Sequence, residues 1–472
     1  WRRADHLAKW LRTSTDALLD RVENAAPFEP MPILFLPPYH ALGYDRFDAQ
    51  TVRRLAAAYA GRGATVSGAP SASAAAKAAR KSLRRKRGGD GRLVVGFMSP
   101  DFGDHPTSHL MRSVWVLLQR RGRVKGVCFA RSPDDGSEQR AYLQATCEEW
   151  VDVSAASWTD LAAAVAAAGV EVLVDLNGHC GRPQMEALSL RGAPLTITYM
   201  GHPGTSGAAF VDYAIADRVT SPPALASQFS EKLLLLPQWH VTDYRYSHAF
   251  EVLKEGGGGL VLRGEVVEKG AEKRSVAEGL AMARRDLEGG PSSRTAKWPS
   301  VLSRRDAALP DEVPVFASFN QLYKVTPKYF EAWANALRRV GDARLWYLEF
   351  PRTAAKNLRL QAAAAGVRVG RLHVSGTTER RHHLARVTLA DLSLDTGPYN
   401  GHTSAGDATW MGVVGVSVLG GMMQSRVAAS YAVNAGGAYT VVRSMKEYED
   451  AVERVEGWRL EVARERLKEM RW

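Results

Sequence analysis

Apolar residues occur along this chain in short runs separated by stretches of helical spacing, and this alternation is found twice. The first series runs from residue 93 to 236 and the second from residue 313 to 433. Short apolar runs bounded by turn residues are typical of buried strands, and apolar residues three or four apart are typical of helices. Strands that alternate with helices predict parallel, doubly wound sheets. The pattern therefore indicates an α/β fold with two similar units.

The runs also place the individual elements. In the first unit we expect strands at 93–98, 124–130, 170–176, 195–200, 213–217 and 233–236, and helices at 106–119 and 158–168. In the second unit we expect strands at 313–319, 343–350, 372–375, 392–395 and 413–419, and helices at 328–340, 354–365, 379–387, 404–411 and 425–433. Two such units joined by a linker place a ligand in the cleft between them, beyond the carboxyl ends of the strands.

Breaks in the alternation divide the chain into segments. These are a helical segment (1–68), a basic flexible linker (69–91), a first lobe (92–245), a low-complexity insertion or linker (246–311) and a second lobe (312–472). The insertion contains a tetraglycine and a second cluster of glycine, proline and serine, a composition typical of mobile connections. We expect no catalytic residue there.

Composition and charge exclude some partners. The hydrophobic share of 45% and the charged share of 24% are those of a soluble globular protein. No apolar run approaches the roughly 20 residues of a membrane helix, so no membrane partner is expected. Much of the net charge of +12 lies in one basic run at 80–87. Because no aromatic residues interleave this run, we interpret it as a solvated linker rather than a nucleic-acid site, an import signal being the other reading.

The chain has three cysteines, Cys128, Cys147 and Cys180. Their spacing is not that of a metal site, and they are too few for a disulfide framework. A reducing compartment is therefore predicted. The chain also lacks an Asp-x-Asp triplet, so any bound diphosphate is expected to be neutralised by a lysine and backbone dipoles rather than by a divalent ion.

Three loops of the first unit carry candidate chemistry at expected strand ends. His105 directly precedes Pro106, which suits the first position of a helix. A helix N-terminus keeps an imidazole neutral and able to accept a proton, although His105 could equally be a plain helix cap. The loops 177–180 and 201–207 follow the next strands, and the glycines of the second allow either close approach to a ligand or a tight turn.

In the second unit a lysine and a polar turn follow two strands. Lys324 lies five residues after the strand that ends at Phe319, and an ammonium there suits a phosphate group or is simply a surface charge. The stretch 395–407 leads from another strand into a helix. Its hydroxyls and free backbone N–H groups form an anion site of the kind that holds a diphosphate, and Asp407 could accept ribose hydroxyls. The alternative is a turn capped by Thr403 or Ser404.

These motifs together resemble those of a known family. The stretches Asp101–Leu110, Gly201–Ala208, Phe319–Lys324 and Asn400–Thr403 are similar to motifs of the O-linked N-acetylglucosamine (O-GlcNAc) transferases, glycosyltransferase family 41. They occur in the same order and with similar sequence between them, so the resemblance is specific. It covers most of the two expected lobes.

The resemblance implies a GT-B fold, in which two Rossmann-like doubly wound domains face a cleft, preceded here by a helical segment. It implies transfer of N-acetylglucosamine from UDP-N-acetylglucosamine to Ser/Thr hydroxyls of cytoplasmic and nuclear proteins, with inversion and with neither cofactor nor metal. His105 is implied as the general base and Lys324 as the second catalytic residue, at the diphosphate. The implied substrate-binding residues are Gly201, Gln321, Lys324, Thr378, Arg380, His383, Tyr399, His402, Thr403, Ser404 and Asp407.

Some of these residues have implied roles of their own. Gln321 is expected at the diphosphate and nucleotide, Arg380 and His383 at the uridine, and Asp407 at the ribose. His402, Thr403 and Ser404 are expected at the diphosphate. Arg380 and Ser404 replace the family's usual Lys and Thr. Tyr399 stands where the animal enzymes carry a small Cys beside the N-acetyl group, so the sugar is less determined than the nucleotide.

Two alternatives remain open from the sequence. One is the related protein O-fucosyltransferase branch, which uses GDP-fucose, and the other is a catalytically silent module that binds nucleotide sugars or proteins. The resemblance also predicts a tetratricopeptide array ahead of Trp1, through which the protein could oligomerise, and a final helix after Trp472.

Overall fold

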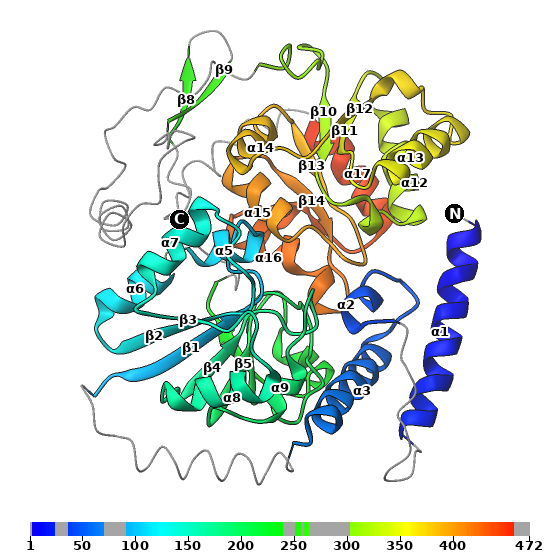
Figure 1. The fold of residues 1–472 in the computed structure, drawn as a ribbon. Coiled ribbons are helices and arrows are strands. Elements are labelled where there is room, and N and C mark those ends of the chain that lie inside the picture. The colour runs from blue at the N-terminus through cyan, green and yellow to red at the C-terminus, as the bar shows by residue number, and fades with distance from the viewer. Residues whose placement is uncertain are drawn as a thin grey trace.

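Two parallel sheets, each covered by helices, stand one above the other (Figure 1). The computed structural model describes residues 2–23, 36–69, 91–112, 114–238, 251–255, 259–263 and 303–456. Among these residues the first sheet has seven strands and the second has six. The predicted α/β class with two doubly wound units is confirmed.

The first lobe is built on the lower sheet of Figure 1. Its strands are β1 (Leu93–Ser99), β2 (Val124–Ala130), β3 (Glu149–Asp152), β4 (Val172–Asp175), β5 (Leu195–Thr198), β6 (Tyr213–Asp217) and β7 (Lys232–Leu236). Its helices are α5 (Pro106–Met111), α6 (Val114–Arg121), α7 (Glu138–Thr146), α8 (Trp158–Ala167), α9 (Met185–Ser189) and the 3-10 helix η1 (Pro223–Gln228). The single helix predicted at 106–119 is wrong, because α5 and α6 are separate helices.

The second lobe repeats the arrangement. Its strands are β10 (Val315–Ser318), β11 (Arg344–Leu348), β12 (Leu372–Ser375), β13 (Leu392–Leu394), β14 (Gly415–Val418) and β15 (Val441–Val442). Its α-helices are α12 (Pro327–Arg339), α13 (Arg352–Ala364), α14 (Arg380–Val387), α15 (Thr403–Trp410), α16 (Val427–Asn434) and α17 (Met445–Glu456). Short 3-10 helices are η2 (Leu322–Lys324), η3 (Val369–Arg371), η4 (Met423–Ser425) and η5 (Ala438–Thr440).

The strand order brings the loops with candidate chemistry together. The first sheet runs β3-β2-β1-β4-β5-β6-β7 and the second β12-β11-β10-β13-β14-β15, so the order reverses beside β1 and beside β10. In open parallel sheets, ligands bind outside the carboxyl ends of the strands at such a reversal. The loops after β1, β4, β10 and β13 lie at these positions and contain His105, the stretch 177–180, Lys324 and the stretch 395–402, whereas the loop 201–207 follows the next strand, β5.

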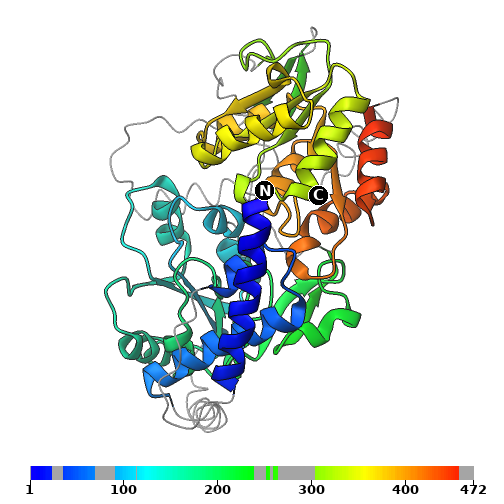
Figure 2. The ribbon, with the colours of Figure 1, turned by 90° about the vertical axis from the view of Figure 1, so that its right-hand side faces the viewer.

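The N-terminal helices pack on both lobes. They are α1 (Arg2–Glu23), α2 (Pro38–Ala41) and α3 (Ala49–Ser67), and α1 begins at the height of the junction and runs down beside the first lobe (Figure 2). Arg54 of α3 pairs with Asp20 and Glu23 of α1, at 2.5 and 2.8 Å. A side chain at Gly207, whose φ is +67°, would collide with the backbone of α3, so glycine permits this close approach.

Contacts between the lobes are both polar and apolar. Arg426 donates to the carbonyl of Val219 across the junction at 2.8 Å, and Gln228 donates to that of Gly421 at 2.8 Å. Leu110 of α5 packs in a cluster with Val427 and Tyr431 of α16. The two lobes are therefore held in one arrangement in which their strand-end loops face each other.

Two features of the fold differ from the sequence predictions. Strands β8 (Glu251–Glu255) and β9 (Gly259–Arg263) form an antiparallel pair inside the stretch expected to lack regular structure. Each contains a short apolar run, and the tetraglycine at 256–259 lies between the two runs, which is a hairpin pattern. Cys128 of β2 and Cys147 at the end of α7 form a disulfide, which removes the support that the cysteines gave to the prediction of a reducing compartment. Their 19-residue separation gives no sign that the α7 segment folds back onto β2.

Candidate active site between the two lobes

The loop after β1 carries His105 at the start of α5. The His105 Nδ1 accepts a hydrogen bond from the Thr107 amide at 3.3 Å, and it lies 3.5 Å from an Asp101 carboxylate oxygen. The imidazole is 44% exposed. His105 is thus the cap of α5, and its imidazole is partly open to solvent.

Hydrogen bonds from side chains of the first lobe fix the backbone of this loop. Ser108 donates to the Asp101 carbonyl at 2.5 Å, and Gln139 of α7 donates to the Ser108 carbonyl at 2.9 Å. The buried Arg140 donates to the Phe102 carbonyl at 2.7 Å. The backbone around His105 is therefore fixed by α7, an element that the sequence analysis did not anticipate.

The loop after β4 lies next to that of His105. Asn177 donates to the Asp101 carboxylate at 2.9 Å and accepts from Ser99 at 2.9 Å. Burial, reinforced by the nearby Asp101 and only partly offset by Tyr39, raises the pKa of the Cys180 thiol to about 11, so this thiol is protonated at neutral pH. Cys180 thus brings an uncharged polar group to the junction.

Two buried histidines link the loops that follow β4 and β5. His179 shares a hydrogen bond of 2.7 Å with the Ser206 carbonyl, and its ring meets the His202 ring edge-on at 5.2 Å. Burial lowers the pKa of His179 to about 4 and that of His202 well below its usual value, so both rings are neutral. Gly201 is needed because a side chain there would strike the backbone of residues 176 and 177.

Lys324, in η2 after β10, faces these loops from the second lobe. Its ammonium donates to the Asn400 carbonyl at 3.1 Å and lies 4.1 Å from the centre of the Tyr399 ring. Burial lowers the pKa of this amine to about 7, although Asp395 and Cys180 favour its charged form. Both of the direct partners are uncharged, so the ammonium can still neutralise an anion.

The stretch 395–402 is folded around the buried Asp395. This carboxylate accepts from the Gly401 amide and from the Ser417 hydroxyl, each at 2.6 Å. Burial raises its pKa to about 6, and the hydrogen bonds and Lys324 limit that rise. Asn320, two residues after β10, donates to Thr396 at 3.1 Å and accepts from Ser404. Asp395 and Asn320, which the sequence analysis did not single out, therefore shape the turn.

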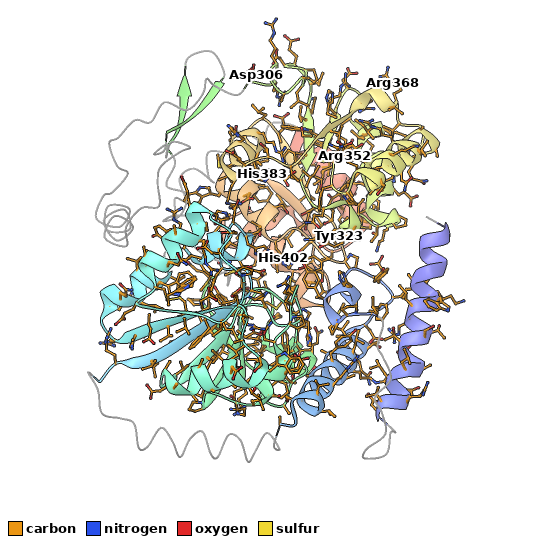
Figure 3. All side chains as sticks on the ribbon, in the orientation of Figure 1. Asp306, Tyr323, Arg352, Arg368, His383 and His402 are labelled. Carbon is orange, nitrogen blue, oxygen red and sulfur yellow. A yellow bond between two sulfur atoms is a disulfide. The ribbon has the colours of Figure 1, made fainter. Side chains whose placement is uncertain are left out.

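Helix α15 begins immediately after this turn. The residue that precedes it, His402, makes no side-chain cap to the helix, and its Nε2 shares a hydrogen bond of 3.1 Å with the Gln424 carbonyl. The alternative of a turn capped by Thr403 or Ser404 is thus not what the structure has. Tyr323 and His402 lie where the second lobe faces the first (Figure 3), so α15 begins near the junction of the lobes.

Asp407 of α15 forms an ion-pair cluster with Arg380 and His383. The sequence analysis named these three residues but did not predict that they pair with one another. Arg380 binds its two carboxylate oxygens at 2.8 and 3.3 Å, and the His383 Nε2 lies 3.4 Å away. Burial alone would raise the pKa of Asp407, but the two basic groups outweigh it and hold that pKa well below its usual range. Gln321 and Thr378, two further predicted residues, are exposed.

Arg380 also approaches the first lobe. Burial lowers the pKa of His109 of α5, and the positive charge of Arg380 lowers it further. Asp104, hydrogen-bonded to His109 at 2.8 Å, acts in the opposite direction and raises that pKa. The Asp407 cluster therefore lies close to the loop that carries His105. Residues of both lobes thus come near the junction, and we call the following set the inter-lobe site: Asp101, His105, Cys180, Lys324, Arg380, Tyr399, His402 and Asp407.

Comparison with known proteins identifies the family. A sequence profile of glycosyl transferase family 41 matches residues 71–257 and 254–472. The chain belongs to this family.

Named relatives of this chain support the assignment to family 41. It is 33% identical over 368 residues to "Probable UDP-N-acetylglucosamine--peptide N-acetylglucosaminyltransferase SEC" of Arabidopsis thaliana, covering 78% of this chain and 33% of that one. It is 30% identical over 421 residues to "UDP-N-acetylglucosamine--peptide N-acetylglucosaminyltransferase" of Caenorhabditis elegans, covering 76% and 36%. The chain thus spans about one third of the length of these relatives.

A solved structure confirms the GT-B fold of this family 41 chain. An O-GlcNAc transferase mutant of Thermobaculum terrenum superposes with a TM-score of 0.70 at 22% identity, covering 98% of this chain and 77% of that one. At 22% identity, this likeness supports the fold and no statement about function. The predicted recognition of the family and the GT-B architecture are both confirmed, whereas the roles of the individual site residues stay predictions.

Proposed function

We propose that this chain is the catalytic region of a protein O-GlcNAc transferase, which transfers N-acetylglucosamine from UDP-N-acetylglucosamine to Ser/Thr hydroxyls of proteins. Membership of family 41 and relatives named for this reaction support the activity. The observation that carries the proposal is the position of Lys324 beside the turn that opens α15, whose first helical residue is Thr403. An ammonium and helix-start amides at one point form a site for a diphosphate.

The donor is held by the second lobe in this proposal. Lys324 and the amides at Thr403 and Ser404 bind the diphosphate, with His402 and Gln321 beside them. Asp407 accepts hydrogen bonds from the ribose hydroxyls, because its carboxylate is kept ionised by Arg380 and His383. Arg380, His383 and Thr378 contact the uridine, and Gly201 and Tyr399 border the sugar. These roles rest on the family resemblance and on the convergence of the residues.

The chemical step then follows from charge. An acceptor hydroxyl oxygen attacks the anomeric carbon, the bond from that carbon to the UDP oxygen breaks, and its electron pair leaves with UDP. Lys324 and the α15 amides face this developing charge, a stabilisation worth several kcal/mol. The hydroxyl proton passes to His105 or to a water, a contribution of roughly 10²–10⁴-fold. Attack from the face opposite UDP inverts the configuration.

The remaining expectations are also proposals. Within the described residues there is no group of three or more His, Cys, Asp or Glu side chains that could hold a metal ion, and no helix long and apolar enough to span a membrane. We propose metal-independent transfer to intracellular proteins of the cytoplasm and nucleus. The cysteine argument for a reducing compartment no longer supports this location, because Cys128 and Cys147 are paired. Oligomerisation through upstream repeats, and the segment boundaries, stay predictions.

Transfer of label from UDP-N-acetylglucosamine to an acceptor peptide tests the proposal. We expect transfer by the wild-type protein in the presence of EDTA, and none by Lys324→Ala, whose circular dichroism should match that of the wild type. Lys356→Ala, an exposed lysine of α13, is the matched control and should transfer normally. Wild-type turnover by Lys324→Ala would sink the role given to this lysine.

Calorimetry separates the proposal from the alternatives. UDP should bind more tightly than GDP, and tighter GDP binding would favour the fucosyltransferase reading. UDP binding without any transfer by the full-length protein would favour the silent module.

A further inference from the structure

The N-terminal helices contribute a side chain to the inter-lobe site. Tyr39 lies in α2 and belongs to the segment that packs α1 and α3 together through Leu42, Phe47 and Leu55. The same apolar cluster contains Tyr399 of the second lobe. A segment 360 residues away in sequence is thus in direct contact with the turn that leads into α15.

The contact is made by polar groups as well as by rings. The Tyr399 hydroxyl donates to the Tyr39 hydroxyl at 3.2 Å, and the two rings meet edge-on at 5.7 Å. The Tyr323 hydroxyl and the Cys180 thiol also interact with the Tyr39 side chain. Tyr39 therefore joins the first lobe, the second lobe and the N-terminal segment at one point.

Tyr399 is held on its other sides by residues of the proposed diphosphate site. Its ring stacks on His402 at 4.7 Å with an interplanar angle of 26°, and the Lys324 ammonium lies 4.1 Å from its centre. The side chain is only 4% exposed. Since an ammonium is attracted to the face of an aromatic ring, the orientation of Tyr399 determines how strongly Lys324 is held.

We propose that Tyr39 is a positioning residue, whose hydroxyl holds the Tyr399 ring against the Lys324 ammonium. In this way the N-terminal segment completes the cation site of the second lobe. The inference rests on the proposed function for its catalytic consequence, but the contact itself can be tested without any substrate. Tyr39 and Tyr399 do not take part in the covalent step.

Other groups around Lys324 must be kept unchanged in the test. Asp395 at the end of β13 and Cys180 after β4 act on the charge of Lys324, and Tyr323 lies on the same 3-10 helix. Replacing tyrosine by phenylalanine removes one hydroxyl and leaves these groups in place. Tyr44 is the matched control, because it lies in the same segment and packs its ring on Phe47 at 6.1 Å.

Nitrogen NMR of ¹⁵N-lysine-labelled protein, without ligand, follows the titration of the Lys324 ammonium. Tyr39→Phe should lower its titration midpoint by roughly half a pH unit, the size expected when a cation–π contact is weakened. Tyr399→Phe should give the same shift, and the double variant no more than either single one, because both remove one shared hydrogen bond. Tyr44→Phe should leave the midpoint unchanged.

The opposite results would overturn the proposal. A wild-type midpoint in both Tyr39→Phe and Tyr399→Phe, or an equal shift in Tyr44→Phe, would show that the hydroxyl pair does not act on Lys324. Thermal melting of each variant shows whether the protein is folded. If Tyr39→Phe melts at a low temperature, Tyr399→Phe still tests the contact, because it removes the same hydrogen bond from the second lobe.

Transfer assays of the same variants add the catalytic consequence. Tyr39→Phe should reduce kcat by about threefold to tenfold with a smaller change in KM, since the charge on the leaving group develops only in the transition state. An unshifted NMR midpoint rejects the positioning role whatever the activity. Absence of transfer by the wild type, with the NMR shift present, rejects the proposed function and leaves the positioning role standing.

Discussion

Lys324 is placed by the fold in surroundings that its sequence position does not reveal. The sequence predicts only an ammonium after a strand, which is as typical of a surface lysine as of a phosphate ligand. The structure surrounds it with Tyr399 and the Asn400 carbonyl, from a turn about 75 residues further along the chain. Motif spacing identifies the residue, but it cannot show the ring that the ammonium rests on.

The partly exposed Lys324 should also affect how stability depends on pH. Burial lowers its pKa from the ordinary 10.5 to about 7. Between these values the unfolded chain binds a proton that the folded protein does not, so stability rises with pH across this range. Below pH 7 the folded protein carries the charge at a cost of about 2 kcal/mol after allowance for partial exposure.

Lys324→Met should therefore stabilise the protein by about this amount at pH 6 and by much less at pH 10. Denaturant unfolding at the two pH values measures the difference. Lys356→Met, at an exposed position of α13, serves as the control and should show no such trend. A gain that is equal at both pH values would contradict the burial of the Lys324 charge.

At the scale of elements, the buried strands are the most predictable part of the fold. Strand β2 was predicted with its observed bounds, because its second half, Val127 to Ala130, is a buried apolar run of the kind found in parallel strands covered on both faces. Strand β3 (Glu149–Asp152) was missed because it is half polar, and β15 because it has two residues. Helix α7 was missed as well, and with it the support of the His105 loop. Whether an element supports a loop depends on packing, which periodicity does not encode.

The disulfide ties α7 to β2 and should add to the stability of the first lobe. A cross-link that closes a loop of 19 residues contributes about 3 kcal/mol by restricting the unfolded chain. Cys147→Ser should lower the free energy of unfolding by about that amount, and a reducing agent should have the same effect on the wild type. Cys180→Ser, which changes the free thiol, should leave the sensitivity to reductant intact. Identical unfolding of oxidised and reduced wild type would show that the bond is not formed in solution.

At the scale of the whole molecule, activity should depend on how the lobes are joined. The proposed donor-binding groups lie almost entirely on the second lobe, whereas His105 lies on the first. The sequence predicted both lobes and a ligand between them. It could not predict the junction, since contacts such as Arg426 with Val219 join residues 207 apart.

Arg426 provides a test of this junction. Its Nε donates to the Val219 carbonyl of the first lobe and its Nη1 to the Gly420 carbonyl of the second, each at 2.8 Å. Arg426→Met keeps the aliphatic stem and removes both donors, so each carbonyl loses a partner at a cost of about 1–3 kcal/mol. We expect melting several degrees lower and kcat/KM for transfer reduced about tenfold, while UDP affinity stays within about twofold, because in the proposed function the second lobe holds UDP and the reaction also needs His105 of the first.

A matched variant controls for loss of an arginine as such. Arg338 of α12 donates to the Ala365 carbonyl and to Asn335, both in the second lobe. Arg338→Met should leave both UDP affinity and transfer close to wild type. If Arg426→Met weakened UDP binding as much as transfer, the junction would be shaping the donor site itself, and the division of labour between the lobes would be wrong. If neither changed, the contact across the junction would have no part in bringing His105 to the donor.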